Sequence, residues 1–543
     1  MIQLLLSAVL WATNLGSPRV AWHYDTGNII MCSPAVGDLD PTQPGSEVVI
    51  GHMHGRFVCL ASDGRFLWDF DAGGWCLHPA IADIDDDGTA EVFLHTLRAT
   101  GPANVYCLNS DGSLRWSYYV GHSHYGGLTV ANVDTVGDAE VLAGGPNSLL
   151  CLNSDGSLKW SYPVGNEVCS PAVANVDEQG TPEVIFGSAN GRVYCLDCDG
   201  NLKWYISLTY ASEAVSIADV DLDGEAEIVA VSSVTSPNNV LYCLEGDGSL
   251  RWSKQLLIGG SAWLSMAAID DINNDFLPEI VVFSDCYSDN RDSLYAVQDG
   301  GDSARVVWVR RAVDTSGGSS TAPVICDLDG DGIKEVIWQG TSYLRIYDGL
   351  DGATVYENSS FRSYTAREHP AVADLNGDGH ADIVAIYEDT EVGVLTSDDW
   401  AECRDQFSCY TYHITNINDD LSVPRIAPKH WECYNSWLAQ EFRAEELCSI
   451  SGGKFYDSDV DGVWDAGEVG LADWLIILEG GVKVPDHPHI WAISEVDDEP
   501  RSRFSGRGYY LPIRQAIQLL SVDSTYTDTG GRYGFADLEP GTY

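Results

Sequence analysis

One phrase returns eight times between residues 33 and 376, and it restricts the fold more than any other feature. A short apolar stretch such as Pro34-Ala-Val ends in an acidic loop, and a second apolar stretch led by an acid follows. The copies are spaced by roughly the 40–50 residues of a four-stranded propeller blade. They begin at Ser33, His78, Leu128, Ser170, Val215, Met266, Ala322 and His369. The repeat predicts an all-β chain organised as a ring of blades.

Each copy is consistent with four short strands, and the fourth strand carries an aromatic residue. An Asp-Gly hairpin turn precedes that strand in several copies, as at Asp155-Gly156. The aromatic positions are Trp68, Trp116, Trp160, Trp204, Trp252, Trp308 and Tyr356. We expect these rings to pack between blades and not to form a platform for sugars.

The eighth copy lacks such a strand, but Arg19-Val-Ala-Trp22, before the first copy, supplies the missing phrase. An N-terminal strand that pairs with the last three strands closes a ring and removes exposed sheet edges. We therefore predict an eight-bladed β-propeller. Seven blades is the alternative, with one copy used elsewhere and Tyr410-Thr-Tyr-His competing for the closing position.

The repeat also sets the domain boundaries. Residues 1–17 contain an apolar run that indicates a signal peptide or its remnant. Residues 19–400 form the predicted propeller, 401–447 an irregular, aromatic closing segment and linker, and 448–543 a separate domain.

Five cysteines occupy equivalent third-strand positions, which predicts buried thiols and not disulfides. They are Cys59, Cys107, Cys151, Cys195 and Cys243.

The loop after each first strand carries oxygen-bearing residues at alternate positions and an acid at the ninth. Ca²⁺ takes roughly six to eight oxygen ligands, and a glycine at the sixth position lets the backbone turn. Carboxylates this close repel one another unless a cation lies among them. The predicted ligands are Asp83, Asp85, Asp87 and Glu91; Asp219, Asp221, Asp223 and Glu227; Asp271, Asn273, Asp275 and Glu279; Asp327, Asp329, Asp331 and Glu335; and Asp374, Asn376, Asp378 and Asp382. Five loops in register therefore predict several structural calcium ions.

Three loops are defective, and we expect them to bind weakly or not at all. The first contains an insertion, and the third and fourth have Val136 and Gln179 at the fifth position. All three nevertheless keep the acid that leads the second strand, which is Glu47, Glu140 or Glu183. The sixth loop keeps its oxygens but has Phe276 in place of the glycine.

The loop phrase resembles the FG-GAP/VCBS repeats of integrin-α-like propellers, which implies loops that bind Ca²⁺. The Asp-Gly-x-Leu-x-Trp phrase is similar to the repeats of pyrroloquinoline-quinone-type (PQQ-like) propellers. Together the two resemblances cover roughly residues 19–400. They imply the same ring fold that the spacing predicts.

A second calcium-loop pattern lies near the C-terminus. Oxygens fall at the spacing of an EF-hand loop, although strands and not helices are predicted on both sides. The predicted ligands are Asp457, Asp459, Asp461, the carbonyl of Val463, Asp465 and Glu468. With Thr527–Tyr543, this segment resembles the SD-repeat protein B-type (Cna-B-like) domain, a β-sandwich stalk module of surface adhesins. The connection 481–526 is longer than usual for that family, and the domain is expected to be incomplete.

Charge and motif content narrow the function. With 29 Lys+Arg against 81 Asp+Glu, the net charge of −52 excludes binding to nucleic acids and anionic membrane surfaces. No segment has the length of a transmembrane helix, so no membrane span is expected. Neither a nucleophile elbow nor a zinc-protease or P-loop motif occurs, and no catalytic residue is assigned.

Three hypotheses remain. The first is a secreted or cell-surface calcium-binding protein, not an enzyme, that acts in adhesion or recognition of an extracellular protein or glycan or serves as a structural scaffold. The second is a PQQ-type quinoprotein, and the third a polysaccharide-active enzyme or lectin. The first is preferred because its support covers nearly the whole chain.

Overall fold

The structure is a computed structural model that divides into two compact units, Met1–Phe442 and Arg443–Tyr543. In the first unit it describes residues 15–97, 103–121, 126–177, 179–208, 212–232, 238–258, 262–286, 292–312, 321–364 and 368–440. In the second it describes 448–453, 475–479, 522–526 and 532–538.

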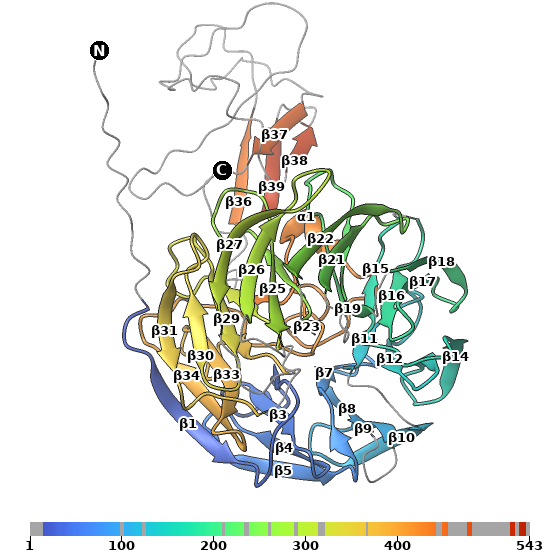
Figure 1. Ribbon diagram of the computed structural model, residues 1–543, viewed down its shortest axis with the longest axis vertical. Coiled ribbons are helices and arrows are strands. Elements are labelled where there is room, and N and C mark those ends of the chain that lie inside the picture. The colour runs from blue at the N-terminus through green and yellow to red at the C-terminus, as the bar shows by residue number, and fades with distance from the viewer. Residues whose placement is uncertain are drawn as a thin grey trace, which may run out of the picture. The chain divides into compact units, whose positions relative to one another are not determined.

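The first unit is an eight-bladed β-propeller (Figure 1). Blade 1 comprises β2 (Ala35–Gly37), β3 (Glu47–Gly51), β4 (Arg56–Leu60) and β5 (Phe66–Asp71). Blade 2 comprises β7 (Ala80–Ala82), β8 (Glu91–Leu97), β9 (Ala103–Leu108) and β10 (Leu114–Gly121), and β6 (Trp75–Cys76) also pairs with β8. Blade 3 comprises β11 (Thr129–Ala131), β12 (Glu140–Gly144), β13 (Ser148–Leu152) and β14 (Leu158–Pro163), and blade 4 comprises β15 (Ala172–Ala174), β16 (Glu183–Ser188), β17 (Arg192–Leu196) and β18 (Leu202–Ser207).

Blades 5 to 8 follow the same plan. Blade 5 comprises β19 (Ser212–Ala218), β20 (Glu227–Ser232), β21 (Asn238–Leu244) and β22 (Leu250–Ile258). Blade 6 comprises β24 (Ala268–Asp270), β25 (Glu279–Cys286), β26 (Ser293–Gln298) and β27 (Arg305–Arg311), and β23 (Ala262–Leu264) also pairs with β25. Blade 7 comprises β28 (Val324–Cys326), β29 (Glu335–Gln339), β30 (Leu344–Tyr347) and β31 (Thr354–Asn358), and blade 8 comprises β32 (Ala371–Ala373), β33 (Asp382–Tyr387), β34 (Glu391–Thr396) and β1 (Arg19–Asp25).

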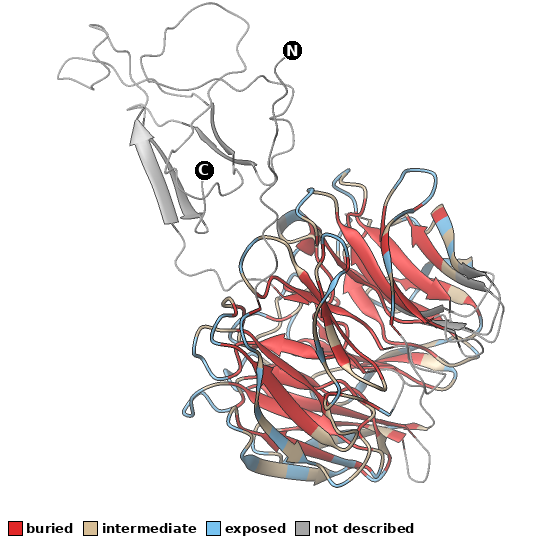
Figure 2. Ribbon diagram, turned by 60° about the vertical axis from the view of Figure 1, so that its left-hand side comes forward, coloured by how far each residue is buried: buried red, intermediate tan, exposed pale blue. Residues whose placement is uncertain are grey.

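Ring closure occurs as the sequence predicts. Strand β1 pairs antiparallel with β34, so the first described strand completes the last blade. The three inner strands of most blades are buried, and the fourth strand alternates between exposed and half-buried residues (Figure 2). The eight-bladed prediction is confirmed, and the seven-bladed alternative is wrong.

The fourth-strand tryptophans join neighbouring blades, as expected. The indole N–H of Trp116 in blade 2 donates to the carbonyl of Ser154 in blade 3 at 2.8 Å. Its ring covers Gly156, where an added Cβ would lie 2.5 Å from the indole. The φ of Gly156 is +80°, so the Asp-Gly turn needs glycine for both backbone and space. Trp22, Trp68, Trp160, Trp204 and Trp308 likewise donate to a backbone carbonyl of the next blade. Trp252 donates instead to the carboxylate of Asp299 in blade 6.

The expected buried thiols are also present. Cys59, Cys107, Cys151, Cys195 and Cys243 are free and buried.

Residues 401–440 differ from the linker expected for this part of the chain. They run through the centre of the ring and include the short helix α1 (His430–Cys433) and strand β35 (Ala439–Gln440), which pairs parallel with β28 (Figure 1). We call them the central plug. Seven blades form hydrogen bonds to the plug from their inner strands or from the residue directly after them. The pairs, written blade residue first, are Val36 N–H to Phe407 O, Ile81 N–H to Ser408 O, Thr129 with Thr411, Ile217 O with His430, Ile269 N–H to Trp437 O, Ile325 N–H to Leu438 O and Asp374 N–H to Arg404 O. The plug is therefore part of the propeller core.

The described part of the second unit contains two antiparallel pairs of strands. Strand β36 (Cys448–Gly453) pairs with β39 (Arg532–Leu538), and β37 (Leu475–Glu479) pairs with β38 (Val522–Tyr526). The predicted calcium ligands between Asp457 and Glu468 lie outside the described residues. The SD-repeat B-type domain remains a prediction. Among the helices that the structure describes, none is long and apolar enough to cross a membrane.

Candidate metal centres in the blade loops

The acid that leads the second strand has the same backbone contact in all eight blades, at the ninth loop position everywhere except in blade 1, where the insertion moves Glu47 to the tenth. One carboxylate oxygen, Oε2 in Glu335, accepts the N–H of the second loop residue, Leu328, at 2.7 Å. The equivalent acids are Glu47, Glu91, Glu140, Glu183, Glu227, Glu279 and Asp382. This contact accounts for the acid being kept in the three defective loops, because it joins the second strand to the loop whether or not an ion binds.

The first-position aspartates also bind the backbone of their own loops. In blade 7, Asp327 accepts N–H groups from Gly330 at 2.7 Å and from Gly332 at 3.0 Å. Asp83, Asp219, Asp271 and Asp374 make the corresponding contacts. The curled loop therefore exists before any ion is considered, and its geometry directs the acids inward.

In three of the five complete loops, the acids at the first, third and ninth positions offer ligand atoms within 4.8 Å of one another. These groups are Asp83, Asp85 and Glu91; Asp219, Asp221 and Glu227; and Asp327, Asp329 and Glu335. The fifth-position acids Asp87, Asp223 and Asp331 are outside these groups, and each accepts an N–H two residues further on. The fifth-position acids Asp275 and Asp378 accept the corresponding N–H groups.

Blade 7 has the clearest deficit of positive charge. Glu335 is fully buried, and its Oε1 has no hydrogen-bond partner, although it lies in the group with Asp327 and Asp329. Burial raises the pKa of Glu335 to about 9 and that of Asp327 to about 6. In blade 8, Asp382 similarly has one unpartnered buried oxygen, and burial raises its pKa to about 7. Hard oxygens without partners fit a cation that coordinates oxygen, such as Ca²⁺.

In blades 2 to 4, the other oxygen of the ninth-position acid instead meets a cationic side chain. Lys159 Nζ lies 2.5 Å from Glu140 Oε1 and 2.5 Å from the third-position Asp134. Lys203 pairs with Glu183 at 2.7 Å and also with Asp177. In blade 2, Arg115 lies 2.5 Å from Glu91 Oε1 and also contacts Asp85.

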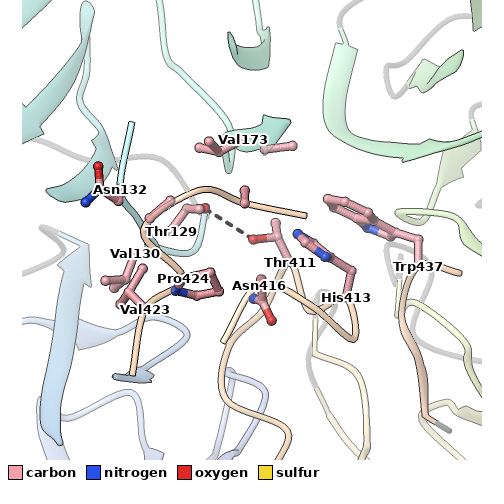
Figure 3. Close-up of a pocket in the computed structure, with 13 residues that line it drawn as sticks. Thr129, Val130, Asn132, Val173, Thr411, His413, Asn416, Val423, Pro424 and Trp437 are labelled. Carbon is pink, nitrogen blue, oxygen red and sulfur yellow. Dashed lines mark hydrogen bonds between the residues drawn. The ribbon is translucent and has the colours of Figure 1, made fainter. Parts of the chain in front are cut away.

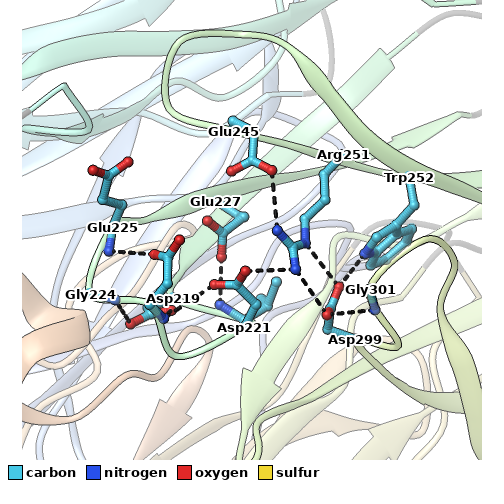
Figure 4. Close-up of polar contacts among 12 residues, drawn as sticks. Asp219, Asp221, Gly224, Glu225, Glu227, Glu245, Arg251, Trp252, Asp299 and Gly301 are labelled. Carbon is cyan, nitrogen blue, oxygen red and sulfur yellow. Dashed lines mark hydrogen bonds and ion pairs between the residues drawn. The ribbon is translucent and has the colours of Figure 1, made fainter.

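In blade 5 a cationic side chain reaches the acidic loop, but one oxygen of the ninth-position acid still has no partner (Figure 4). Arg251 pairs with Asp221 at 2.6 Å, but the guanidinium is shared with Glu245 and Asp299. One oxygen of Glu227 remains without a partner, and burial raises the pKa of this acid to about 9.

Blade 6 satisfies its ninth-position acid with amides. Asn273 Nδ2 donates to Glu279 Oε1 at 2.7 Å, and Gln298 Nε2 donates to the same oxygen at 3.0 Å. These amide and cationic partners of the acids were not predicted from the sequence. The signal for the cations was present, because Arg or Lys directly precedes the tryptophan in the phrases Leu114-Arg-Trp, Leu158-Lys-Trp, Leu202-Lys-Trp and Leu250-Arg-Trp.

A second candidate region lies where the central plug meets blades 3 and 4 (Figure 3). A hollow of about 370 Å³, including space open to solvent, is lined by Thr129 and Val173 from the blades and by Thr411, His413 and Trp437 from the plug. Among the described residues that line it, His413 alone is titratable, and burial holds its pKa well below its usual value. These described residues include no pair of carboxyl groups for general acid and base chemistry.

The fold and loops define an eight-bladed β-propeller with FG-GAP-like repeats. The FG-GAP-like repeat model matches residues 219–282 and 327–385. The model described as outer membrane protein assembly factor BamB matches residues 7–164 and 86–233.

Individual proteins resemble this chain either over a short segment or over most of its length at low sequence identity. A segment of 75 residues is 35% identical to lambda-carrageenase of Pseudoalteromonas sp and of Pseudoalteromonas carrageenovora, which is 14% of this chain and only 8% of the carrageenase. The V. cholerae biofilm matrix protein Bap1 superposes with a TM-score of 0.60 at 17% identity, over 78% of this chain and 99% of Bap1. BamB from Moraxella catarrhalis gives a TM-score of 0.47 at 15% identity, over 70% of this chain and 98% of BamB.

Proposed function

We propose that this chain is a secreted or cell-surface scaffold that binds an extracellular protein or glycan and does not catalyse a reaction. The observation that carries the proposal is the filled centre of the ring. Propeller enzymes need a pocket with convergent reactive groups, and the central plug takes the hydrogen-bonding positions of the inner strands there. The hollow beside the plug offers one buried, neutral histidine.

Calcium is proposed as the structural ion of the loops in blades 7 and 8. Asp327, Asp329, Asp331 and Glu335 would hold it in blade 7, and Asp374, Asn376, Asp378 and Asp382 in blade 8. Ca²⁺ would supply positive charge to buried oxygens that have no hydrogen-bond partner among the residues the structure describes, without taking part in a reaction. A rigid ring stabilised by ions outside the cell suits a matrix or adhesion role. Bap1, which superposes on this chain at 17% identity, is a biofilm matrix protein.

The test combines binding and activity on the full chain with calcium present. The protein is applied to an array of acidic and neutral polysaccharides, and each retained glycan is then assayed for new reducing ends. Retention without new reducing ends supports a binding role. Retention followed by chain cleavage contradicts it.

A polysaccharide-active enzyme is the second candidate, and the carrageenase segment favours it. That segment covers 8% of the carrageenase, so the activity of the whole relative is not carried over with it. New reducing ends from carrageenan would establish this alternative. A quinoprotein would show the absorbance of a bound quinone after purification, and the filled channel argues against it.

A further inference from the structure

Every blade has a β-bulge at one equivalent residue of its fourth strand. In blade 3, Cys151 pairs with Trp160 and Leu152 pairs with Leu158, so Lys159 is the extra residue between them. A bulge redirects the side chain of its extra residue. In blades 2 to 4, this side chain reaches the acidic loop of its own blade.

We call this residue the bulge residue. It is always the residue before the fourth-strand aromatic. In order from blade 1 to blade 8, the bulge residues are Leu67, Arg115, Lys159, Lys203, Arg251, Val307, Val355 and Ala21. Blades 2 to 5 therefore carry a cation at this position, whereas blades 1, 6, 7 and 8 carry an apolar side chain.

In blades 2, 3, 4, 7 and 8, the bulge residue correlates with the partner of one particular oxygen. The ninth-position acid always uses one oxygen for the backbone N–H, and its second oxygen varies between blades. In blades 2 to 4 a bulge cation pairs with that oxygen. In blades 7 and 8, where the bulge residue is Val355 or Ala21, the second oxygen of Glu335 or Asp382 is buried and unpartnered. This oxygen is therefore paired with the bulge cation in blades 2 to 4 and has no such partner in blades 7 and 8.

We propose that the bulge residue decides which loops bind calcium: Lys or Arg at the bulge replaces the ion in blades 2 to 4, and an apolar bulge residue leaves blades 7 and 8 to bind it. The inference rests on the proposed calcium-stabilised function. It assigns no ion to blade 2, although that loop has a complete ligand pattern in Asp83, Asp85, Asp87 and Glu91.

The physical reason is competition for one position. Lys159 and Arg115 bring their positive charge between the third- and ninth-position acids, two of the ligands that a loop ion would use. A divalent ion there would be repelled by the charged head group and would lose two of its ligands to it. Blades 3 and 4 also lack the fifth-position acid, so their lysines compensate for loops that cannot complete a cage.

The sequence matches divide the ring in nearly the same place. The FG-GAP-like model matches 219–282 and 327–385, which include the loops of blades 7 and 8. The BamB model matches within 7–233, which includes Arg115, Lys159 and Lys203. Blade 5 lies where the matches overlap, and Arg251 there pairs with Asp221 but leaves an oxygen of Glu227 free of partners.

The decisive experiment moves the cation between blades in the full chain. Arg115→Leu gives blade 2 the bulge residue of blade 1, and Val355→Arg gives blade 7 the bulge residue of blade 2. Bound calcium per chain is measured by elemental analysis after equilibrium dialysis at about millimolar free calcium. We expect R115L to bind one ion more than the wild type and V355R one ion fewer.

Three control variants separate charge, size and loop completeness. Arg65→Leu removes an exposed arginine of blade 1, and Val355→Leu adds bulk without charge, so both should keep the wild-type ion count. Lys159→Leu opens a loop without the fifth-position acid and should gain no ion. In a chelator, both R115L and K159L should melt below the wild type, and added calcium should restore only R115L.

The outcomes distinguish this inference from the proposed function. If R115L binds as many ions as the wild type while the wild type itself binds calcium, the role of the bulge residue is wrong. If V355R keeps the full ion count of the wild type, the role of the bulge residue is likewise wrong. If V355R does not fold, the ion count of R115L alone decides the question. A wild-type chain that binds no calcium and melts identically in chelator refutes the calcium-stabilised function itself.

Discussion

Lys203 reaches across the third strand of blade 4 and places its Nζ 2.7 Å from Oε1 of Glu183. Glu183 is almost fully buried, whereas the lysine side chain is 30% exposed. The lysine therefore neutralises a carboxylate that has no contact with water, in a loop that lacks the ligands for a metal ion.

Lys203→Met should destabilise the propeller by about 2 kcal/mol. This is less than the roughly 3–5 kcal/mol for breaking a fully buried pair, because the lysine is partly solvated. Adding Glu183→Gln should recover part of the loss, since the amide oxygen can still accept the N–H of Val176. Urea denaturation of both single variants and the double variant measures the coupling. Additive effects would mean that the two side chains act independently.

The Trp116 contact with the turn of blade 3 predicts different costs for two glycine substitutions. Gly156→Ala and Gly165→Ala both place a side chain at positive φ, +80° and +76°, which costs about 1–2 kcal/mol. Gly165 has open space around it, whereas a Cβ at Gly156 would meet Trp116. G156A should lose about a further 1–3 kcal/mol from overpacking and shift the tryptophan emission. Equal losses in the two variants would show that the inter-blade contact is loose.

Removal of calcium should lower the melting temperature of the wild type, and return of calcium should restore it. Within blade 7, Asp331→Ala should remove one ion per chain, because it deletes one of the four predicted ligands of that loop. Glu183→Gln in blade 4 is the matched control, since its loop is neutralised by Lys203. Elemental analysis of the variants measures the ion count. An unchanged melt in excess chelator would contradict a structural role for calcium.

The features that repeat were predictable from the sequence. The spacing of the copies gave the blade count, and the phrase around Trp22 gave the closing strand, because each depends on local patterns that recur. The cross-blade packing of Trp116 and its counterparts followed from the same periodicity.

The central plug and the bulge cations were not predicted, for physical reasons. Residues 401–440 have no repeat, and their order comes from bonds to inner strands far away in sequence, such as Phe407 O to Val36 N–H. Lys159 looks like an ordinary solvated strand residue, since simple alternation along a strand does not reveal a bulge. The contact between Lys159 and the acidic loop therefore depends on a register shift that sequence spacing alone does not show.

Buried His430 predicts a loss of stability in mild acid. Its Nε2 lies 2.7 Å from the carbonyl of Ile217, and burial lowers its pKa to about 4. In the unfolded chain a histidine takes up a proton near pH 6.5, so protonation favours unfolding as the pH falls from about 6.5 to 4. By linkage, this one residue costs about 2 kcal/mol at about pH 5 relative to pH 7.5.

His430→Gln isolates that contribution, because the carboxylates of the protein are common to both chains. The difference in free energy of unfolding between the wild type and H430Q should shrink by about 2 kcal/mol between about pH 7.5 and pH 5. Urea denaturation at the two pH values measures it. A difference independent of pH would show that His430 has the same pKa in the folded and the unfolded chain.

Arg404 anchors the central plug from within. Its guanidinium donates to the carbonyl of Ile417 at 2.9 Å, to the hydroxyl of Tyr412 at 3.1 Å and to the carbonyl of Ile414. The side chain is 8% exposed, whereas its acidic partner Asp419 is 62% exposed. The buried end of this network should therefore contribute far more stability than the exposed ion pair.

Arg404→Met keeps the apolar stem but removes the guanidinium donor from Tyr412, Ile414 and Ile417, of which only the Ile417 carbonyl keeps another donor among the described residues, Gln406, and this should cost about 3–5 kcal/mol. Asp419→Asn removes only the exposed charge and should cost at most about 1 kcal/mol. Hydrogen exchange at the amides of Val36 and Ile325 gives a local readout, because both donate to plug carbonyls at 3.0 Å. Faster exchange at these amides in R404M, with D419N unchanged, would show that the plug is held by its buried arginine. If the amides stay protected while R404M loses stability, the plug is held by its strand contacts instead.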